Sequence, residues 1–352
     1  MSRILKKHII NTGKYAVYLY TAIFILSICL CWIDHLNLFS LESIFFGLSY
    51  FPPLWFILFI VPSIGGALLI RNKRLALSVS IIYIIFFLLY GDISLIKPAY
   101  KVNKEKGKKI SVLALNIQYY NHGLKKVIRE IKNINADITL LSENILKEDE
   151  LKYVRSELSP WQFLAGKPEE TAVISKYPVI SWKEIELPSH EASLWGGNRI
   201  ETLSQNPHRS FIHAVINIKG TRVNAISIRF IAGRAESEKM GEQLKWGRYI
   251  VKTQIEEVKF FKEYLSEIEG PIIFGGDLNV PPNTHVIKEL NQIAIDGYMA
   301  TNLYGKPTFN TACPFLRLDY IYSIDLIPIN SKVLDIVISD HYPLYAEFLL
   351  SK

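Results

Sequence analysis

The chain opens with three long apolar stretches separated by short polar or charged segments. They run from about residue 15 to 33, from 53 to 70 and from 75 to 90, and none of them contains a charged side chain. Runs of this length are sufficient to cross the hydrocarbon core of a bilayer as helices. Pro62 is expected to kink the second one. The pattern predicts about three transmembrane helices that form an anchor over residues 1–96.

The charges that flank these stretches predict an orientation. Four basic residues precede the first stretch and three lie in the turn at 71–74, whereas the loop between the first and second stretches has Asp34 and Glu42 and no Lys or Arg. The positive-inside tendency therefore puts the N-terminus and this turn in the cytoplasm and residues 97–352 outside the cytoplasmic membrane. The linker at 97–109 opposes this orientation, because it is basic and favours the cytoplasmic side.

From residue 110 onward, short β-rich runs and helical patterns replace the long apolar stretches. Short β-rich runs, such as ISVLALNI and PIIFGGDLN, are apolar at successive positions, which is typical of strands buried on both faces. They alternate with helical patterns at 124–134 and 243–268. We therefore predict an α/β sandwich over residues 110–352.

Charge is distributed unevenly between these parts. The formal net charge is +7, yet residues 110–352 hold 27 basic and 29 acidic residues. The basic excess thus belongs to the anchor and the linker. A domain that binds a nucleic-acid duplex usually has a basic surface, so this balance argues against an obligate DNA-binding protein. The three cysteines imply no disulfide framework.

Polar side chains interrupt the apolar runs at their ends. A single carboxylate in such a place is usually a helix cap or a solvated loop residue. Together, these amide, carboxylate and imidazole groups suit a hard divalent ion and a proton shuttle. The residues are Asn116, Glu143, Asp277, Asn279, Asp319, Asp340 and His341.

Their order along the chain resembles the endonuclease/exonuclease/phosphatase superfamily, which includes DNase I, apurinic endonucleases, neutral sphingomyelinases and inositol-polyphosphate 5-phosphatases. The resemblance covers essentially all of 110–352 and implies a four-layer α/β/β/α sandwich with the site at one edge. The matching segments are LNIQ, LLSEN, TAVISKYPV, GGDLNVPP, RLDYIYS and SDHYPLYAEF.

The resemblance also implies the metal and its ligands. Glu143 would be the main ligand of Mg²⁺ (with Mn²⁺ as an alternative), assisted by Asn116 and by Gln118 or Asp340. Mg²⁺ is usually held by few carboxylates and several waters, which this small set allows.

The catalytic roles follow in the same way. Asp277 would orient or deprotonate the attacking water, and Asn279 would hold a phosphoryl oxygen. His341, positioned by Asp319, would stabilise the phosphorus centre or protonate the leaving group.

One position departs from the family pattern. Many relatives have a His, or in apurinic endonucleases a Tyr, in the strand that here reads NAISIRF, and Arg229 takes that place. A guanidinium can grip a phosphate with two hydrogen bonds but cannot transfer protons near neutral pH. Arg229 is therefore a substrate-binding candidate, and a solvent-facing residue at a strand end is the alternative.

The expected activity is hydrolysis of a phosphate ester or pyrophosphate by a phosphoesterase in the cytoplasmic membrane. The expected substrate is a lipid or a lipid-linked phosphate similar to undecaprenyl pyrophosphate, because the domain would be tethered to a bilayer, is not basic and would face outward. The same architecture resembles bacterial membrane members of the superfamily. The alternatives are a membrane-tethered nuclease and a binding module without activity, and no protein partner is indicated.

Overall fold

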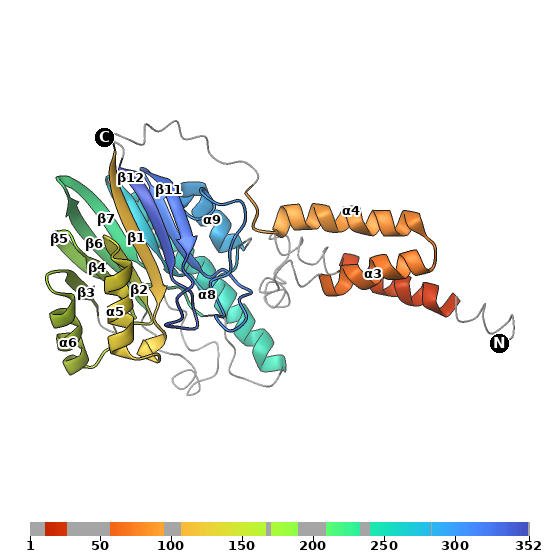
Figure 1. Cartoon of the computed structure of the whole chain (residues 1–352), viewed down its shortest axis with the longest axis horizontal. Coiled ribbons are helices and arrows are strands. Elements are labelled where there is room, and N and C mark those ends of the chain that lie inside the picture. The colour runs from red at the N-terminus through yellow and green to blue at the C-terminus, as the bar shows by residue number, and fades with distance from the viewer. Residues whose placement is uncertain are drawn as a thin grey trace. The chain divides into compact units, whose positions relative to one another are not determined.

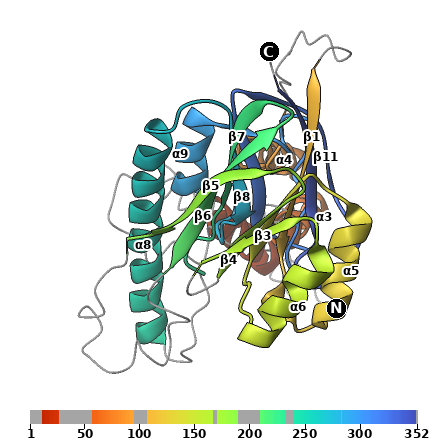
Figure 2. The same cartoon turned by 90° about the vertical axis from the view of Figure 1, so that its left-hand side faces the viewer.

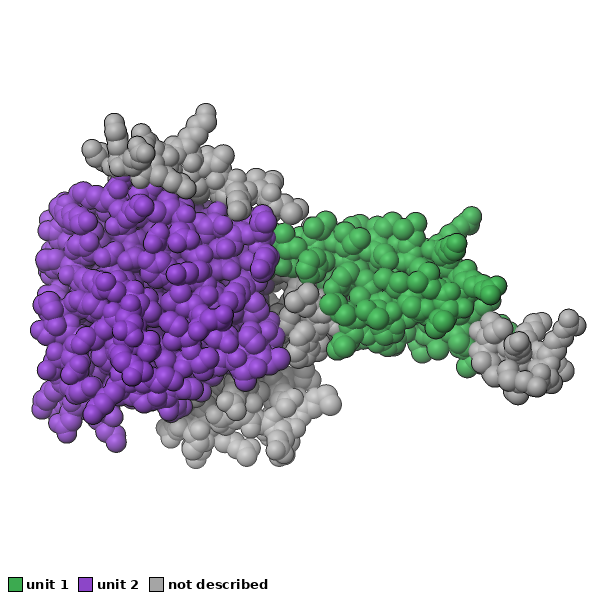
Figure 3. All heavy atoms as spheres, viewed as in Figure 1, with its two compact units in different colours: residues 1–93 green, residues 94–352 purple. Residues whose placement is uncertain are grey.

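The computed structural model describes residues 11–26, 57–94, 107–166, 170–188, 209–232, 240–282 and 284–350. The chain divides into two compact units, residues 1–93 and residues 94–352, which have different colours in Figure 3.

The described part of the first unit is helical. Residues 11–26 form one helix, α3 runs over Ile57–Leu69 and α4 over Lys73–Tyr90. Each helix overlaps one of the predicted apolar stretches, of which residues 27–33 and 53–56 lie outside what the structure describes. In the described parts of the chain, no helix is both long and apolar enough to span a membrane.

Two six-stranded sheets form the framework of the second unit (Figure 1). Most of the predicted linker, residues 97–106, lies outside the described residues, and β1 begins at Lys108. The first sheet, in spatial order, consists of β11 (Leu326–Val333), β12 (Leu344–Leu350), β1 (Lys108–Asn116), β2 (Ile138–Ser142), β4 (Thr171–Ser175) and β3 (Gln162–Ala165). The second consists of β5 (Val179–Glu186), β6 (Ser210–Ile218), β7 (Thr221–Ser227), β8 (Ile272–Asp277), β10 (Asp319–Ile324) and β9 (Ile295–Asp296).

Helices cover the outer face of each sheet, as Figures 1 and 2 show. The first sheet carries α5 (Leu124–Ile134) and α6 (Glu148–Leu158), and the second carries α8 (Met240–Ser266) and α9 (His285–Ile293). Strand β1 shows why its run VLAL is apolar at every position. Val112 and Ala114 face the core between the sheets, whereas Leu113 and Leu115 pack beneath the helices. The predicted four-layer α/β/β/α sandwich is confirmed.

Each sheet contains one parallel pair of strands. Strands β1 and β2 are parallel and are joined through α5, and strands β7 and β8 are parallel and are joined through α8. The other described neighbours are antiparallel. A parallel connection needs a crossover, here a helix, so both strands of a pair end at the same edge of the sheet. The polar residues that end these four strands therefore lie at shared edges.

Hydrogen bonds join these two edges across the sandwich. The Ser227 hydroxyl donates to the Leu141 carbonyl at 2.9 Å, and the Asp277 amide donates to the Ser142 hydroxyl at 3.1 Å. The carboxyl ends of all four parallel strands thus meet in one place, and the site described below is built there.

Two glycines let β8 approach its neighbours just before Asp277. A Cβ on Gly275 would collide with the Tyr320 carbonyl of β10, and a Cβ on Gly276 would collide with the Ile228 carbonyl. Gly276 also has a φ of +136°, which residues with a side chain rarely adopt. The sequence Gly-Gly-Asp therefore places the Asp277 carboxylate by bringing its backbone unusually close to two neighbouring segments.

We expect Gly276→Ala to lower the free energy of unfolding by about 2 kcal/mol or more, because it combines a backbone clash with an unfavourable φ. Gly220→Ala is the matched control, since Gly220 has a φ of +89° with no atom near its would-be Cβ, and it should cost about 1 kcal/mol. Urea unfolding of the full chain measures both. Equal losses would show that the close approach of β8 contributes nothing.

Candidate functional site

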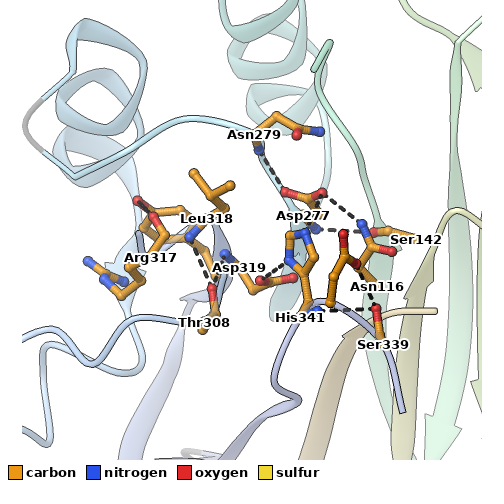
Figure 4. A network of polar contacts seen from close by, with 12 residues as sticks. Asn116, Ser142, Asp277, Asn279, Thr308, Arg317, Leu318, Asp319, Ser339 and His341 are labelled. Carbon is orange, nitrogen blue, oxygen red and sulfur yellow. Dashed lines mark hydrogen bonds and ion pairs between the residues drawn. The ribbon is translucent and has the colours of Figure 1, made fainter. Parts of the chain in front are cut away.

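Asp277 lies at the centre of a buried polar network (Figure 4). Its side chain is 1% exposed. The Asn116 amide donates to Oδ2 at 2.9 Å, and the Asn279 backbone N–H donates to Oδ1 at 2.9 Å. Burial raises the pKa of Asp277, as does Asp319, whereas His341, Arg229 and the bond from Asn116 lower it. The carboxylate is thus fixed in place by bonds to both oxygens, and its raised pKa suits a general base.

His341 and Asp319 form a pair beside Asp277. His341 Nδ1 lies 2.7 Å from Asp319 Oδ2, and Nε2 lies 3.8 Å from Asp277 Oδ2. The Thr308 hydroxyl accepts from the Asp319 backbone N–H at 3.2 Å and holds this strand end. The predicted orientation of His341 by Asp319 is present in the structure.

The imidazole of His341 is held in its charged form. Burial lowers the pKa of a histidine, but here Asp319, Asp277, the hydrogen bond that the ring donates to Asp319 and the charge of Asp340 outweigh it and raise the pKa to about 10. A charged ring donates from Nδ1 to Asp319 and keeps Nε2–H on the side of Asp277. His341 is therefore suited to stabilise negative charge or to give up a proton there.

Glu143 and Arg229 meet at the same edge. Glu143 follows β2 directly, and Arg229 lies just after the end of β7. The Arg229 Nη2 donates to Glu143 Oε1 at 2.8 Å, and Nη1 lies 3.6 Å from Glu170 Oε2. Arg229 is buried, so the solvent-facing alternative for this residue is wrong. Burial lowers the pKa of its guanidinium, but Glu143, Glu170 and Asp277 outweigh that effect and raise it.

The remaining predicted residues surround this centre. Asn116 also accepts from the Gln118 backbone N–H at 2.9 Å, so both ends of its amide are used within the protein. Asn279 donates from Nδ2 to the Phe230 carbonyl at 2.9 Å and thereby braces the segment after Arg229. Asp340 is half-buried and accepts from the Ser339 hydroxyl at 3.1 Å.

Three ionisable side chains at the site lie as close together as the ligands of a metal ion do. Asp277, Asp319 and His341 offer ligand atoms within 4.8 Å of one another, and Asp319 Oδ1 is buried with no hydrogen-bond partner among the described residues. This group differs from the predicted ligands Glu143, Asn116 and Asp340. The hydrogen bond between His341 Nδ1 and Asp319 Oδ2 already occupies two of the atoms that could bind a metal. We therefore regard these three residues as a proton-transfer group that borders a cation site. The carboxylate of Glu143 is the further acidic donor at this edge.

Among the described residues near Arg229, sequence reasoning missed Glu170, Arg209 and Glu257, which are charged residues with buried side chains. Glu170 precedes β4, Arg209 precedes β6, and Glu257 lies on the buried side of α8. Arg209 Nη2 lies 2.6 Å from Glu257 Oε1. Only Glu257 had a sequence signal, because it belongs to an amphipathic helical pattern whose apolar face it interrupts. Glu170 and Arg209 lie outside any periodic pattern.

The comparisons with known proteins agree with this fold. The model of the Endonuclease/Exonuclease/phosphatase family matches residues 113–341. No curated protein matches the chain.

Solved structures show the same fold at low identity. An endonuclease/exonuclease/phosphatase from Bacteroides vulgatus is 17% identical over 69% of this chain and 100% of its own, with a TM-score of 0.54. A mannosyl-6-phosphatase from Bacteroides thetaiotaomicron is 15% identical over 68% and 99%, with a TM-score of 0.52. A humanized TDP2 from D. rerio is 12% identical over 68% and 98%, with a TM-score of 0.50.

The family match spans most of the chain and includes every site residue described above from Asn116 to His341. The chain therefore belongs to the endonuclease/exonuclease/phosphatase family, whose members are phosphoester hydrolases that generally depend on a divalent metal.

Proposed function

We propose that this protein is a Mg²⁺-dependent phosphoesterase whose centre is Asp277. The observation that carries the proposal is the position of this buried carboxylate, which is braced by Asn116 on one side and faces the charged ring of His341 on the other. An acid and a base in adjacent positions are what hydrolysis of a phosphate ester requires.

Each residue of the site has a separate role in the proposed hydrolysis. Asp277 orients a water and accepts its proton, and Asn279 binds a phosphoryl oxygen. His341, held by Asp319, stabilises the negative charge that develops on the phosphoryl group or protonates the leaving oxygen. Glu143, with Asn116 and Asp340, would hold the Mg²⁺, and Mn²⁺ is an alternative. When bound, the ion supplies Lewis-acid stabilisation of the phosphoryl charge.

We expect loss of the central acid–base pair to reduce turnover sharply. Asp277→Asn and His341→Ala should each lower kcat by roughly 10²–10⁴-fold, the usual cost of losing a positioned acid or base. Glu289→Gln, a change in the Lys262–Glu289 ion pair between α8 and α9, is the control and should leave kcat unchanged.

The pH profile supplies a second readout in the same experiment. Wild-type activity should decline as the pH rises through about 10, where His341 loses its proton. Asp319→Asn removes a partner that raises this pKa, so the activity of the variant should begin to decline at a lower pH than that of the wild type. An unchanged profile in Asp319→Asn would contradict the assigned pairing.

The substrate we favour is a lipid or lipid-linked phosphate, or a pyrophosphate similar to undecaprenyl pyrophosphate. The supporting features are the three apolar stretches, the basic linker at 97–109 and the near-neutral balance of residues 110–352. A nuclease is the second candidate, because TDP2 from D. rerio, complexed with a single-strand DNA product, is 13% identical over 68% of this chain with a TM-score of 0.50.

A hydrolysis screen of the purified full chain distinguishes these candidates. Lipid pyrophosphates should be cleaved faster than plasmid or single-stranded DNA, and excess EDTA should abolish the activity. Persistent activity in EDTA would contradict the metal-dependent mechanism. Faster cleavage of plasmid, falling steeply with salt, would favour the nuclease.

The proposed location is the cytoplasmic membrane, which rests on the three apolar stretches. The proposed orientation, with residues 97–352 on the outer side, rests on the flanking charges. A C-terminal alkaline phosphatase fusion should therefore be active and a C-terminal GFP fusion should be dark. The opposite result would show that the basic linker determines the orientation.

A further inference from the structure

Glu170 is a buried acidic residue of the site that the proposed mechanism does not use. Its side chain is almost fully buried, and neither carboxylate oxygen has a hydrogen-bond partner among the described residues. The nearest cation is Arg229, whose Nη1 lies 3.6 Å from Glu170 Oε2. The Glu170 carbonyl also accepts from the Asn144 backbone N–H at 3.2 Å, which ties Glu170 to the residue that follows Glu143.

The guanidinium of Arg229 is shared between two carboxylates. Nη2 donates to Glu143 at 2.8 Å, and Nη1 points toward Glu170. The chain after Arg229 cannot easily move, because the Ile231 N–H donates to Glu257 Oε2 at 3.0 Å and the Ile231 carbonyl accepts from Gln254 at 3.0 Å. Arg229 is thus a fixed positive charge beside the predicted ligand of the metal.

A fixed positive charge beside a metal ligand opposes binding of the metal unless another anion compensates it. Glu170 is placed to do so, because it is the second carboxylate on the same guanidinium. Burial raises the pKa of Glu170, and the charges of Arg229 and Arg209 oppose that rise. With Glu170 present, Arg229 retains a partner while Glu143 shares its charge with a cation. Without it, Glu143 would be the closest counter-ion left to Arg229.

We propose that Glu170 is a positioning residue of the metal site: by holding Arg229, it leaves the carboxylate of Glu143 available to a divalent cation. The contact between Glu170 and Arg229 also keeps the guanidinium oriented toward Glu143. Residues that contact a metal ligand commonly orient that ligand in this way. This inference rests on the proposed role of Glu143 as a metal ligand. It also reassigns Arg229 from gripping substrate to orienting Glu143.

The test is Mn²⁺ binding to the full chain, followed by electron paramagnetic resonance and without any substrate. Glu170→Gln should weaken Mn²⁺ binding by about 10–100-fold, the usual range for losing a partner of a metal ligand. Asp137→Asn is the matched control. Asp137 lies just before β2, at the opposite end of that strand from Glu143. Its partly buried carboxylate accepts a hydrogen bond from the Ser111 backbone N–H. It should leave the affinity unchanged.

A double-variant cycle separates positioning from direct ligation. If Glu170 acts through Arg229, Glu170→Gln should weaken binding in the wild type and change it less than about threefold in Arg229→Gln. Equal weakening in both backgrounds would make Glu170 a metal ligand and overturn the proposal, as would no weakening in either. Thermal unfolding confirms that each variant is folded. If the Gln variant does not fold, Glu170→Asp, with its carboxylate withdrawn by one methylene, should show the same dependence on Arg229.

Glu143→Gln distinguishes failure of this inference from failure of the proposed function. Loss of Mn²⁺ binding in Glu143→Gln, together with unchanged binding in Glu170→Gln, would overturn the positioning role alone. Unchanged binding in Glu143→Gln would overturn the metal role of Glu143, and with it the role of Glu170.

Discussion

The site depends on one constraint, which is that two parallel pairs of strands end at the same place on opposite sides of the sandwich core. The hydrogen bond from Asn116 to Asp277 joins the end of β1 to the end of β8, and the bond from Asp277 to Ser142 adds the end of β2. Neither sheet alone would assemble these groups. The Asp277 carboxylate is therefore positioned by the packing of the sheets, and the two glycines before it allow the approach.

Much of this arrangement could be predicted from sequence because its signals are local. An apolar run that ends in a polar residue marks both a buried strand and the edge where it emerges, as Asn116 and Asp277 do. The alternation of such runs with amphipathic helices predicted an α/β sandwich, and the family resemblance predicted its four layers. The pairing of His341 with Asp319 was predicted from the family resemblance, since 22 positions separate the two residues and no spacing rule joins them.

The buried ionic groups could not be predicted, because their partners are distant in sequence. Arg229 and Glu143 are 86 positions apart, and Arg209 and Glu257 are 48 apart. A charged residue in a short connection is usually solvated, so Glu170 carries no distinguishing signal until the fold places it against Arg229. For the same reason, the sequence did not decide whether Arg229 binds substrate or faces solvent. It also gave no sign that Arg229 contacts the predicted metal ligand Glu143.

Charge balance links these observations to the metal. In the part of the chain that the structure describes, carboxylates outnumber cationic groups around the site. The carboxylates are Glu143, Glu170, Glu257, Asp277, Asp319 and the half-buried Asp340, and the cationic groups are Arg209, Arg229 and His341. Burial raises the pKa values of Glu170, Glu257 and Asp277, and a buried excess of negative charge is unfavourable without compensation. A bound divalent cation would supply compensating positive charge. Arg229, at the place where the family resemblance leads us to expect a histidine, would then contribute fixed charge instead of proton transfer. This would leave the proton chemistry to Asp277 and His341.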